Sequence, residues 1–245
     1  DIATLTIDTT GQGLHKRGYR TLVTHAPLKE TLAAAMLMIS RWKADRALID
    51  PFCGSGTIPI EAALIAKNIA PGIKRSFTAE SWHQIPQALW NKARQEAEDK
   101  IDNISDLRIH GSDIDNEAVK IARYHAAQAG VEQAVHLQRI PVSDISSRYK
   151  YGFLVCNPPY GERLGEMAEV ERLYKELGSI YKKLDTWSLY TITSHPRFES
   201  FIGRKADKKR KLFNGRIQCN YYQFYGPPPP RDGSQFASLR ESNGG

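Results

Sequence analysis

The sequence predicts an α/β protein in which a mostly parallel, helix-flanked sheet ends in an antiparallel hairpin. The first observation behind this prediction is alternation. From residue 46 to residue 193, short apolar runs alternate with longer segments of helical periodicity, which is typical of βαβ units. The second is a pair of strand-like runs around Asn214-Gly215, because this dipeptide between such runs is the strongest short-range signal for a hairpin.

The elements follow one another in a definite order. We predict a short β-hairpin (1–20), a helix (28–42), a strand (46–50), a helix (58–70), an insertion (71–106), a strand (107–113), a helix (116–130), two strands (135–140 and 151–156), a helix (168–184), a strand (187–193), two hairpin strands (208–213 and 216–225) and a flexible tail (227–245). The strands are short apolar runs, and the first hairpin rests on alternation around the turn-rich TTGQG. Prolines and two tryptophans break the rhythm in the insertion, and the tail is rich in proline and polar residues.

Three of the predicted helices carry apolar side chains on one face at helical spacing. The residues expected to face the core are Leu32, Met36 and Ile39 in the first helix, Val119, Ala122, Ala126 and Ala129 in the third, and Val170, Leu173, Leu177, Ile180 and Leu184 in the fourth.

Composition narrows the classes of partner. The chain of 245 residues has a formal net charge of +7, which fits an anionic partner such as nucleic acid but also occurs in proteins of other function. Cys53, Cys156 and Cys219 stand apart from one another and from any histidine cluster, which predicts reduced thiols and no metal site. No run approaches the roughly 18 apolar residues of a membrane span. We therefore predict a cytoplasmic protein without a membrane partner.

The segment LIDPFCGSGT, residues 48–57, follows the first strand of the parallel sheet. A phosphate-binding P-loop needs a lysine after its last glycine, and a dinucleotide fingerprint needs a third glycine, but Thr57 and Pro59 stand at those positions. What remains is a strand that ends in Asp50 and a tight Gly-x-Gly turn, the pattern of S-adenosylmethionine (AdoMet) binding. AdoMet carries a sulfonium and an ammonium group, which favour a nearby carboxylate, and glycines let the backbone approach the ligand. An ordinary turn between a strand and a helix is the alternative.

Acidic residues also follow the next two strands. Asp113 ends strand 107–113, and Asp144 follows strand 135–140. Ligands of open α/β sheets bind at the carboxyl edge, so we predict that Asp113 accepts hydrogen bonds from the ribose hydroxyls and Asp144 from the adenine amino group. Asp115, just before helix 116–130, is predicted to cap that helix.

The segment NPPY, residues 157–160, ends the strand 151–156. A purine amino group is a poor nucleophile because its lone pair is delocalised into the ring. The Asn157 side-chain oxygen and the Pro158 carbonyl can accept hydrogen bonds from both N–H groups and stabilise the positive charge that develops on the nitrogen. The prolines fix the backbone, and Tyr160 offers a face on which an extruded base can stack. A proline-ended strand with a chance tyrosine is the alternative.

LIDPFCGSGT followed by NPPY resembles the AdoMet-dependent amino-methyltransferases, which act on adenine N6, cytosine N4 or guanine N2. More narrowly, LHKRGYR, APLKETLAAAML, DPFCGSGTIPIEAA, GSDID, NPPYGERLG and FIGRKADKKRKLFNG are similar to segments of the bacterial 23S ribosomal RNA guanine-N2 methyltransferase family. Members of this family were formerly described as N6-adenine-specific DNA methylases. The resemblance covers residue 1 to about residue 226. It implies a Rossmann-like, class I AdoMet-dependent methyltransferase fold with a seven-stranded sheet.

The resemblance also implies a domain arrangement and a set of site residues. Family members carry an RNA-binding THUMP domain before the catalytic domain, so residues 1–26 are predicted to be a linker region, residues 27–226 the methyltransferase domain and residues 227–245 a flexible tail. The implied AdoMet contacts, with S-adenosylhomocysteine as the product, are Ala26, Pro27, Leu28, Asp50, Pro51, Phe52, Cys53, Gly54, Ser55, Gly56, Thr57, Asp113, Ile114 and Asp144. The implied residues around the target base are Asn157, Pro158, Pro159 and Tyr160.

The implied partner is 23S ribosomal RNA or a pre-ribosomal particle. Basic residues predicted to contact its phosphates are Lys16, Arg17, Arg20, Arg204, Lys205, Lys208, Lys209 and Arg210. A solvated, charged edge is the alternative for this basic set. Two other functions remain as alternatives, an adenine-N6 methyltransferase of DNA or RNA, which the same NPPY motif serves, and a non-catalytic AdoMet-binding protein. A nucleotide-dependent oxidoreductase is disfavoured by Pro59. The sequence leaves the modified nucleotide and the oligomeric state open.

Overall fold

The computed structural model describes residues 3–22, 28–161 and 167–230. Its helices (α), strands (β) and 3-10 helices (η) are α1 (Glu30–Ser40), β1 (Leu48–Asp50), α2 (Thr57–Ala66), η1 (Thr78–Ser81), α3 (Gln87–Glu98), β2 (Ile109–Asp113), α4 (Asn116–Ala129), β3 (Val135–Arg139), η2 (Val142–Asp144), β4 (Phe153–Cys156), α5 (Met167–Lys183), β5 (Ser188–Thr193), α6 (Phe198–Ile202), β6 (Lys208–Asn214) and β7 (Ile217–Phe224).

The strands form one seven-stranded sheet in the order β3-β2-β1-β4-β5-β7-β6. The first five strands pair in parallel, and β7 lies antiparallel between β5 and β6. The predicted fold class is therefore confirmed, including the antiparallel hairpin at the end. The strand order changes direction at β1, with β2 on one side and β4 on the other. Ligands of open α/β sheets bind beside such a switch point.

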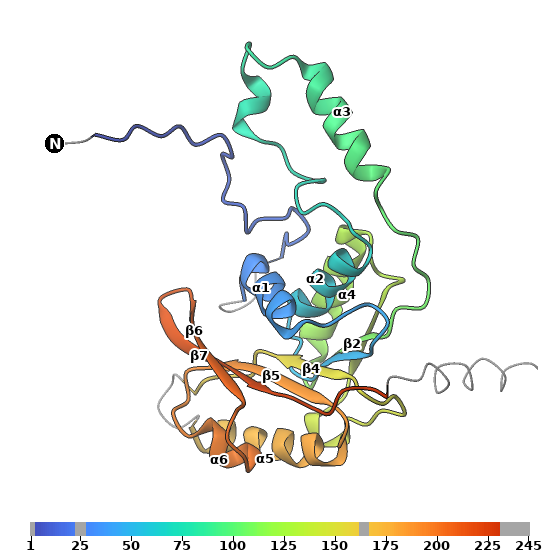
Figure 1. Ribbon diagram of the computed structural model, residues 1–245, viewed down its shortest axis with the longest axis vertical. Helices are drawn as coiled ribbons and strands as arrows, with labels where there is room; N and C mark the ends of the chain where they lie inside the picture. The colour runs from blue at the N-terminus through green and yellow to red at the C-terminus, as the bar shows by residue number, and fades with distance from the viewer. Residues whose placement is uncertain (1–2, 23–27, 162–166, 231–245) are drawn as a thin grey trace, which may run out of the picture.

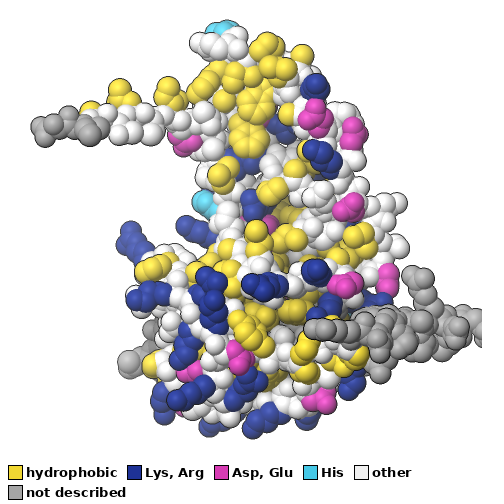
Figure 2. All heavy atoms as spheres, viewed as in Figure 1, with side chains coloured by type: hydrophobic (Ala, Val, Ile, Leu, Met, Phe, Trp, Pro, Cys, Tyr) yellow, Lys and Arg dark blue, Asp and Glu magenta, His cyan; other side chains and the backbone are white. Residues whose placement is uncertain are grey.

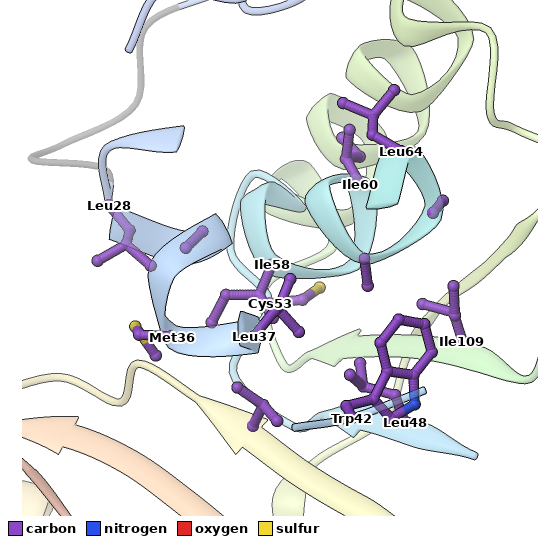
Figure 3. Packing of buried hydrophobic residues seen from close by; sticks show 14 of the residues in the cluster. Leu28, Met36, Leu37, Trp42, Leu48, Cys53, Ile58, Ile60, Leu64 and Ile109 are labelled. Carbon is purple, nitrogen blue, oxygen red and sulfur yellow. The ribbon is translucent and has the colours of Figure 1, made fainter. Parts of the chain in front are cut away.

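Helices cover both faces of the sheet. Figure 1 shows α1, α2 and α4 on one face and α5 with α6 on the other, so the sheet lies between two apolar cores. In the first core, side chains of α1 and α2 pack together on the sheet: Figure 3 shows Leu37 of α1 near Ile58 of α2, and Trp42 beside Leu48 of β1. The inward positions predicted for the helix now labelled α4 are confirmed, because the side chains of Val119, Ala122, Ala126 and Ala129 are buried.

The predicted N-terminal hairpin is wrong. Residues 3–22 contain no strand within the described part of the chain. The backbone carbonyls that a hairpin would pair are bound elsewhere: Arg75 donates hydrogen bonds to the carbonyls of Thr10 and Gly13, and the Ala79 N–H donates to Thr9. Alternation alone does not specify a hairpin when another segment satisfies the same carbonyls.

The chain between α2 and β2 leaves the sheet and returns. It contains η1 and α3, and Figure 1 shows it projecting beyond α2. Among the side chains of α3, none is buried, and Trp90 stacks on Phe77 with ring centroids 5.8 Å apart. This segment coincides with the predicted insertion 71–106, whose boundaries, like the other domain boundaries, stay a prediction. No helix in the described ranges has the length and apolar character needed to cross a membrane.

Candidate active site

A cavity of about 500 Å³ opens at the carboxyl edge of the sheet. Its walls come from the segments that follow β1, β2, β3 and β4 and from one face of α5. The lining residues are Leu28, Asp50, Pro51, Phe52, Cys53, Gly54, Ser55, Thr57, Ile58, Asp113, Ile114, Pro141, Val142, Ser143, Asn157, Pro159, Arg172, Leu173 and Glu176. The structure thus brings residues of the predicted cofactor set and of the predicted base set into one cavity. Ala26 and Pro27 lie outside the described residues.

The glycine loop after β1 needs its two glycines for different reasons. Gly54 has a φ of +50° and lines the cavity, and a Cβ added there would meet no atom within 4 Å, so its backbone stays open to a ligand. Gly56 has a φ of +84° as the N-cap of α2, and a Cβ there would lie 2.9 Å from the Cβ of Ala122. The backbone of the loop therefore lies directly against α4, and only glycine permits this close approach. His125 of α4 also contacts the loop, with its Nδ1 3.1 Å from the Ser55 carbonyl oxygen.

Two carboxyl groups face the loop. The side chain of Asp50 is buried and its Oδ1 accepts a hydrogen bond from the Phe52 N–H at 3.1 Å. Asp113 binds the loop itself, because its Oδ2 accepts from the Gly54 N–H at 2.9 Å. Burial raises the pKa of Asp50 well above its usual range; the hydrogen bond from Phe52 opposes this shift and the nearby charge of Asp113 adds to it. A cationic ligand in the cavity would offset both unfavourable effects.

Asp144 lies beside the main cavity rather than in its wall. It is exposed, accepts a hydrogen bond from the Ser143 hydroxyl at 2.9 Å, and lines a separate cavity of about 250 Å³. Its neighbour Ser143 and the exposed Ile114 face the main cavity. The predicted contact of Asp144 with adenine stays a prediction. Asp115 accepts a hydrogen bond from the Glu117 N–H at 2.8 Å, which confirms it as the N-cap of α4.

The NPPY segment carries an internal hydrogen bond. The Tyr160 hydroxyl donates to Asn157 Oδ1 at 2.5 Å, while Asn157 and Pro159 line the cavity. Pro158 is buried, and the ring of Tyr160 packs against the first apolar core. Burial raises the pKa of Tyr160, so this hydroxyl keeps its proton at neutral pH. The stacking role predicted for Tyr160 stays a prediction.

Tyr174 of α5 holds this segment from the other side. Its side chain is fully buried, and its hydroxyl donates to the Pro159 carbonyl at 2.7 Å and lies 2.8 Å from Thr193 Oγ1. The residue ties the segment after β4 to α5 and β5. Tyr174 was missing from the sequence-based prediction, because in a helical stripe a tyrosine has the pattern of any core residue.

Replacing Tyr174 with phenylalanine should lower the free energy of unfolding by about 1–2 kcal/mol, since the Pro159 carbonyl and the Thr193 hydroxyl then lose a buried partner. Chemical denaturation measures this directly. Tyr181→Phe is the matched control, because it lies on the same helix and its hydroxyl forms no hydrogen bond within the described residues. Equal losses for both variants would contradict the anchoring role of Tyr174.

Helix α5 supplies a wall that sequence patterns did not indicate. Arg172, Leu173 and Glu176 line the cavity, and Arg172 pairs with Glu176 at 3.8 Å. An oppositely charged pair at this spacing ordinarily marks a solvated helix face. Leu173 was predicted to face the core, and it does pack against the second core while also reaching the cavity. Only the placement of α5 beside β4 reveals this wall.

Two of the basic residues predicted to contact RNA phosphates form ion pairs inside the protein. Arg17 pairs with the buried Glu61 at 3.4 Å, and Arg20 pairs with Glu30 at 3.3 Å. Both guanidinium groups are largely withdrawn from solvent, with side chains 12% and 15% exposed. Arg17 and Arg20 therefore fasten the N-terminal segment to α2 and α1, and their predicted contact with RNA stays a prediction. Lys16 is exposed.

The basic residues predicted near the C-terminus are exposed, which fits both the predicted phosphate contacts and the alternative of a solvated edge. Arg204 pairs with Asp207 and Lys209 pairs with Glu199, both at 2.5 Å. The other three, Lys205, Lys208 and Arg210, are exposed on the approach to β6 and on its edge. In the part of the chain that the structure describes, no group of histidine, cysteine or acidic side chains is arranged to hold a metal ion.

Comparison with known proteins identifies relatives over most of the chain. A family model described as UPF0020, RMKL-like, methyltransferase domain, matches residues 17–223. “Putative RNA methyltransferase YpsC” of Bacillus subtilis (strain 168) is 51% identical over 94% of this chain and 60% of that protein. “Ribosomal RNA large subunit methyltransferase K/L” of Shewanella sp. (strain ANA-3) is 40% identical over 94% of this chain and 34% of that protein.

A solved structure also matches most of the chain. The protein SMU.472, described as “a putative methyltransferase complexed with SAH”, is 46% identical with a TM-score of 0.86, over 91% of this chain and 58% of that one. The chain thus spans less than two thirds of the length of each of these relatives.

Proposed function

Because the chain belongs to the UPF0020 family of RMKL-like methyltransferase domains, we propose that it transfers a methyl group from AdoMet to the exocyclic N2 amino group of a guanine in 23S ribosomal RNA. The observation that carries the proposal is the single cavity lined by Asp50, Asp113 and Asn157. The two carboxyl groups suit a cationic cofactor. The amide oxygen beside them suits an amino group as the acceptor of the methyl.

The residues that follow β1 and β2 fit AdoMet. Asp50 and Asp113 provide carboxylates for its charged and hydroxyl groups, Gly54 leaves backbone open to it, and Leu28 and Ile114 provide apolar contacts in the same cavity. A cavity of about 500 Å³ lies in the usual range for a ligand of this size. Bound AdoMet supplies an electrophilic methyl group on its sulfonium.

The residues that follow β4 act on the nucleophile. Asn157 Oδ1 and the Pro158 carbonyl accept hydrogen bonds from the two N–H groups of the target amino group, which fixes the direction of its lone pair. They also stabilise the positive charge that develops on that nitrogen. No strong base is required, since the nitrogen gives up its extra proton readily after methylation. Tyr174 supports this arrangement through the carbonyl of Pro159.

Support for an RNA substrate comes from the relatives. YpsC and the K/L protein are both described as RNA methyltransferases, the second of them acting on the large ribosomal subunit. The choice of guanine N2 rests on the resemblance of segments such as NPPYGERLG to the guanine-N2 family. Adenine N6 in RNA or DNA is the second candidate, because Asn157 and Pro158 offer the same two acceptors to either amino group.

A basic surface over the β6–β7 hairpin suits the phosphates of RNA. Figure 2 shows Lys and Arg side chains gathered there. Replacing Lys205, Lys208 and Arg210 with glutamine should weaken RNA binding and reduce the slope of log affinity against log salt by about 2–3, because fewer counterions are released. Filter binding over a salt series measures both quantities.

The matched control for that experiment replaces Lys92, Lys100 and Lys120, which are exposed on other parts of the molecule. It removes the same charge, so only the location differs. An equal change of slope in both triple variants would contradict a specific role for the hairpin surface.

The remaining parts of the proposal concern the domain arrangement, the compartment and the partner. A THUMP domain ahead of the linker region 1–26 would capture the RNA, and the cytoplasm, where ribosomes assemble, would be the place of action. The proposed partner is 23S ribosomal RNA, free or in a pre-ribosomal particle.

Calorimetry tests the cofactor part of the proposal. AdoMet and S-adenosylhomocysteine should each bind at one site and displace one another, and NAD should not displace them. Binding of NAD without binding of AdoMet would overturn the proposal, because the glycine loop would then be a dinucleotide-binding loop.

A further inference from the structure

A chain of hydrogen bonds connects the tip of the β6–β7 hairpin to the NPPY segment. Asn214 Nδ2 donates to the Tyr160 hydroxyl at 3.3 Å, and that hydroxyl donates to Asn157 Oδ1 at 2.5 Å. All three side chains are half-buried. The two bonds connect Asn214 to Asn157 Oδ1, although Asn214 lies more than fifty positions from Tyr160 and Asn157 in the sequence. Asn157 Oδ1 is the atom proposed to accept a hydrogen bond from the target amino group.

The register of the hairpin is what directs Asn214 to Tyr160. Asn214 pairs with Ile217 as the last residue of β6, so the two-residue loop is Gly215-Arg216, with Gly215 at φ +62°. Asn214 therefore shares a face with Leu212, which packs against the same core as Tyr160. Phe213 points to the opposite face and is 59% exposed. A one-residue slip would exchange these two side chains.

We propose that Asn214 is a positioning residue for methyl transfer: through the Tyr160 hydroxyl it orients Asn157 Oδ1 toward the target amino group. This inference rests on the proposed function of Asn157. An amide oxygen has two lone pairs. With one of them held by Tyr160, the rotation of the Asn157 side chain is fixed and the other lone pair remains for an N–H of the base. Asn214 donates to Tyr160 and Tyr160 donates to Asn157, so the first hydrogen bond strengthens the second.

Burial of Tyr160 supports this relay. Its raised pKa keeps the hydroxyl protonated, so it can donate to Asn157 while it accepts from Asn214. A purely structural role for Asn214, as an anchor of the hairpin tip, would also lower activity when it is removed. The test therefore has to separate action through Tyr160 from loss of stability.

A double-mutant cycle makes this separation. At saturating AdoMet and RNA, Asn214→Ala should lower kcat about tenfold with KM for RNA nearly unchanged, which is the pattern of an interaction made in the transition state. Asn214→Asp keeps the shape but cannot donate, and should lower kcat at least as much. In a Tyr160→Phe background, Asn214→Ala should cause no further loss, because the relay is already broken.

Gln218→Ala is the matched control, since it removes an exposed amide from the same hairpin, and it should keep the wild-type kcat. The inference is overturned if Asn214→Ala keeps the wild-type kcat, or if its loss is the same with and without the Tyr160 hydroxyl. A melting temperature for each variant identifies any loss that comes from unfolding.

A second measurement does not depend on activity. In nuclear magnetic resonance spectra, the side-chain amide signals of Asn157 should shift in Asn214→Ala and in Tyr160→Phe, and remain in place in Gln218→Ala. Unchanged Asn157 signals in Asn214→Ala would overturn the inference even if the protein proved to have another substrate. Inactivity of the wild-type protein toward RNA, with these shifts present, would count against the proposed function alone.

Discussion

Replacing Asn157 with alanine should reduce methyl transfer by about 10²- to 10³-fold, which is the usual effect of removing one group that stabilises developing charge. The side chain lies at the end of β4, where its Oδ1 already accepts from Tyr160 and faces the cavity. Without it, the Pro158 carbonyl alone remains to direct the amino lone pair and to stabilise the charge on the nitrogen. Single-turnover transfer from labelled AdoMet measures the effect.

The affinity for AdoMet separates this role from a general disturbance of the site. Because the cofactor is expected beside β1 and β2, Asn157→Ala should change its dissociation constant by no more than about twofold, so that the loss appears in kcat. Asn68→Ala, which removes an exposed amide outside the cavity lining that donates to the Lys100 carbonyl, is the control for substitution of an asparagine. Wild-type turnover in Asn157→Ala would remove Asn157 from the mechanism.

Replacing Asp50 with asparagine should weaken AdoMet binding about 10- to 100-fold, the loss expected when a charged hydrogen-bond partner becomes neutral. The same change should stabilise the cofactor-free protein by about 1 kcal/mol, as often happens when a residue kept for function is removed. Burial raises the pKa of Asp50, so the folded protein binds this proton more tightly than the unfolded chain does. Ionisation of Asp50 therefore costs stability.

The pH dependence has a definite sign. As the pH rises from the unfolded pKa of an aspartate, about 4, toward the raised pKa of the folded state, the wild-type protein loses stability relative to Asp50→Asn. The advantage of the variant should therefore grow with pH and vanish below about pH 4. A bound cation favours the ionised form, so wild-type affinity for AdoMet should rise over the same interval.

Thermal unfolding at several pH values, with and without AdoMet, measures both effects. Asp45→Asn is the control, since Asp45 is exposed and remote from the cavity lining. A variant Asp50→Asn that is less stable than wild type without cofactor, or that binds AdoMet as tightly, would contradict the assignment of Asp50 to the cofactor site.

The parts of the fold that the sequence predicted depend on short-range chemistry. The Gly-x-Gly turn after Asp50 and the strand-ending prolines of NPPY constrain the backbone locally, so their positions follow from residue type. The C-terminal hairpin followed from Asn214-Gly215, although its loop is one residue further on than the dipeptide indicates. Asp115 as a helix cap is equally local.

The parts that the sequence missed depend on contacts between distant segments. The N-terminal alternation gave the wrong hairpin because Arg75 binds the same carbonyls. Arg17 and Arg20 looked like free cations, but acids on α1 and α2 pair with them. Tyr174 reaches Pro159 only because α5 packs beside β4. Such partners lie many residues apart and leave no signal in either local pattern.

The identity of the methylated nucleoside decides whether the protein methylates guanine N2. Labelled AdoMet is incubated with the protein and with ribosomal RNA that lacks its own modifications, and the digested product is analysed by nucleoside chromatography. We expect N2-methylguanosine from the wild-type protein, and its loss in Asn157→Ala. N6-methyladenosine as the labelled nucleoside would contradict the proposed substrate, and label that persists unchanged in Asn157→Ala would contradict the mechanism.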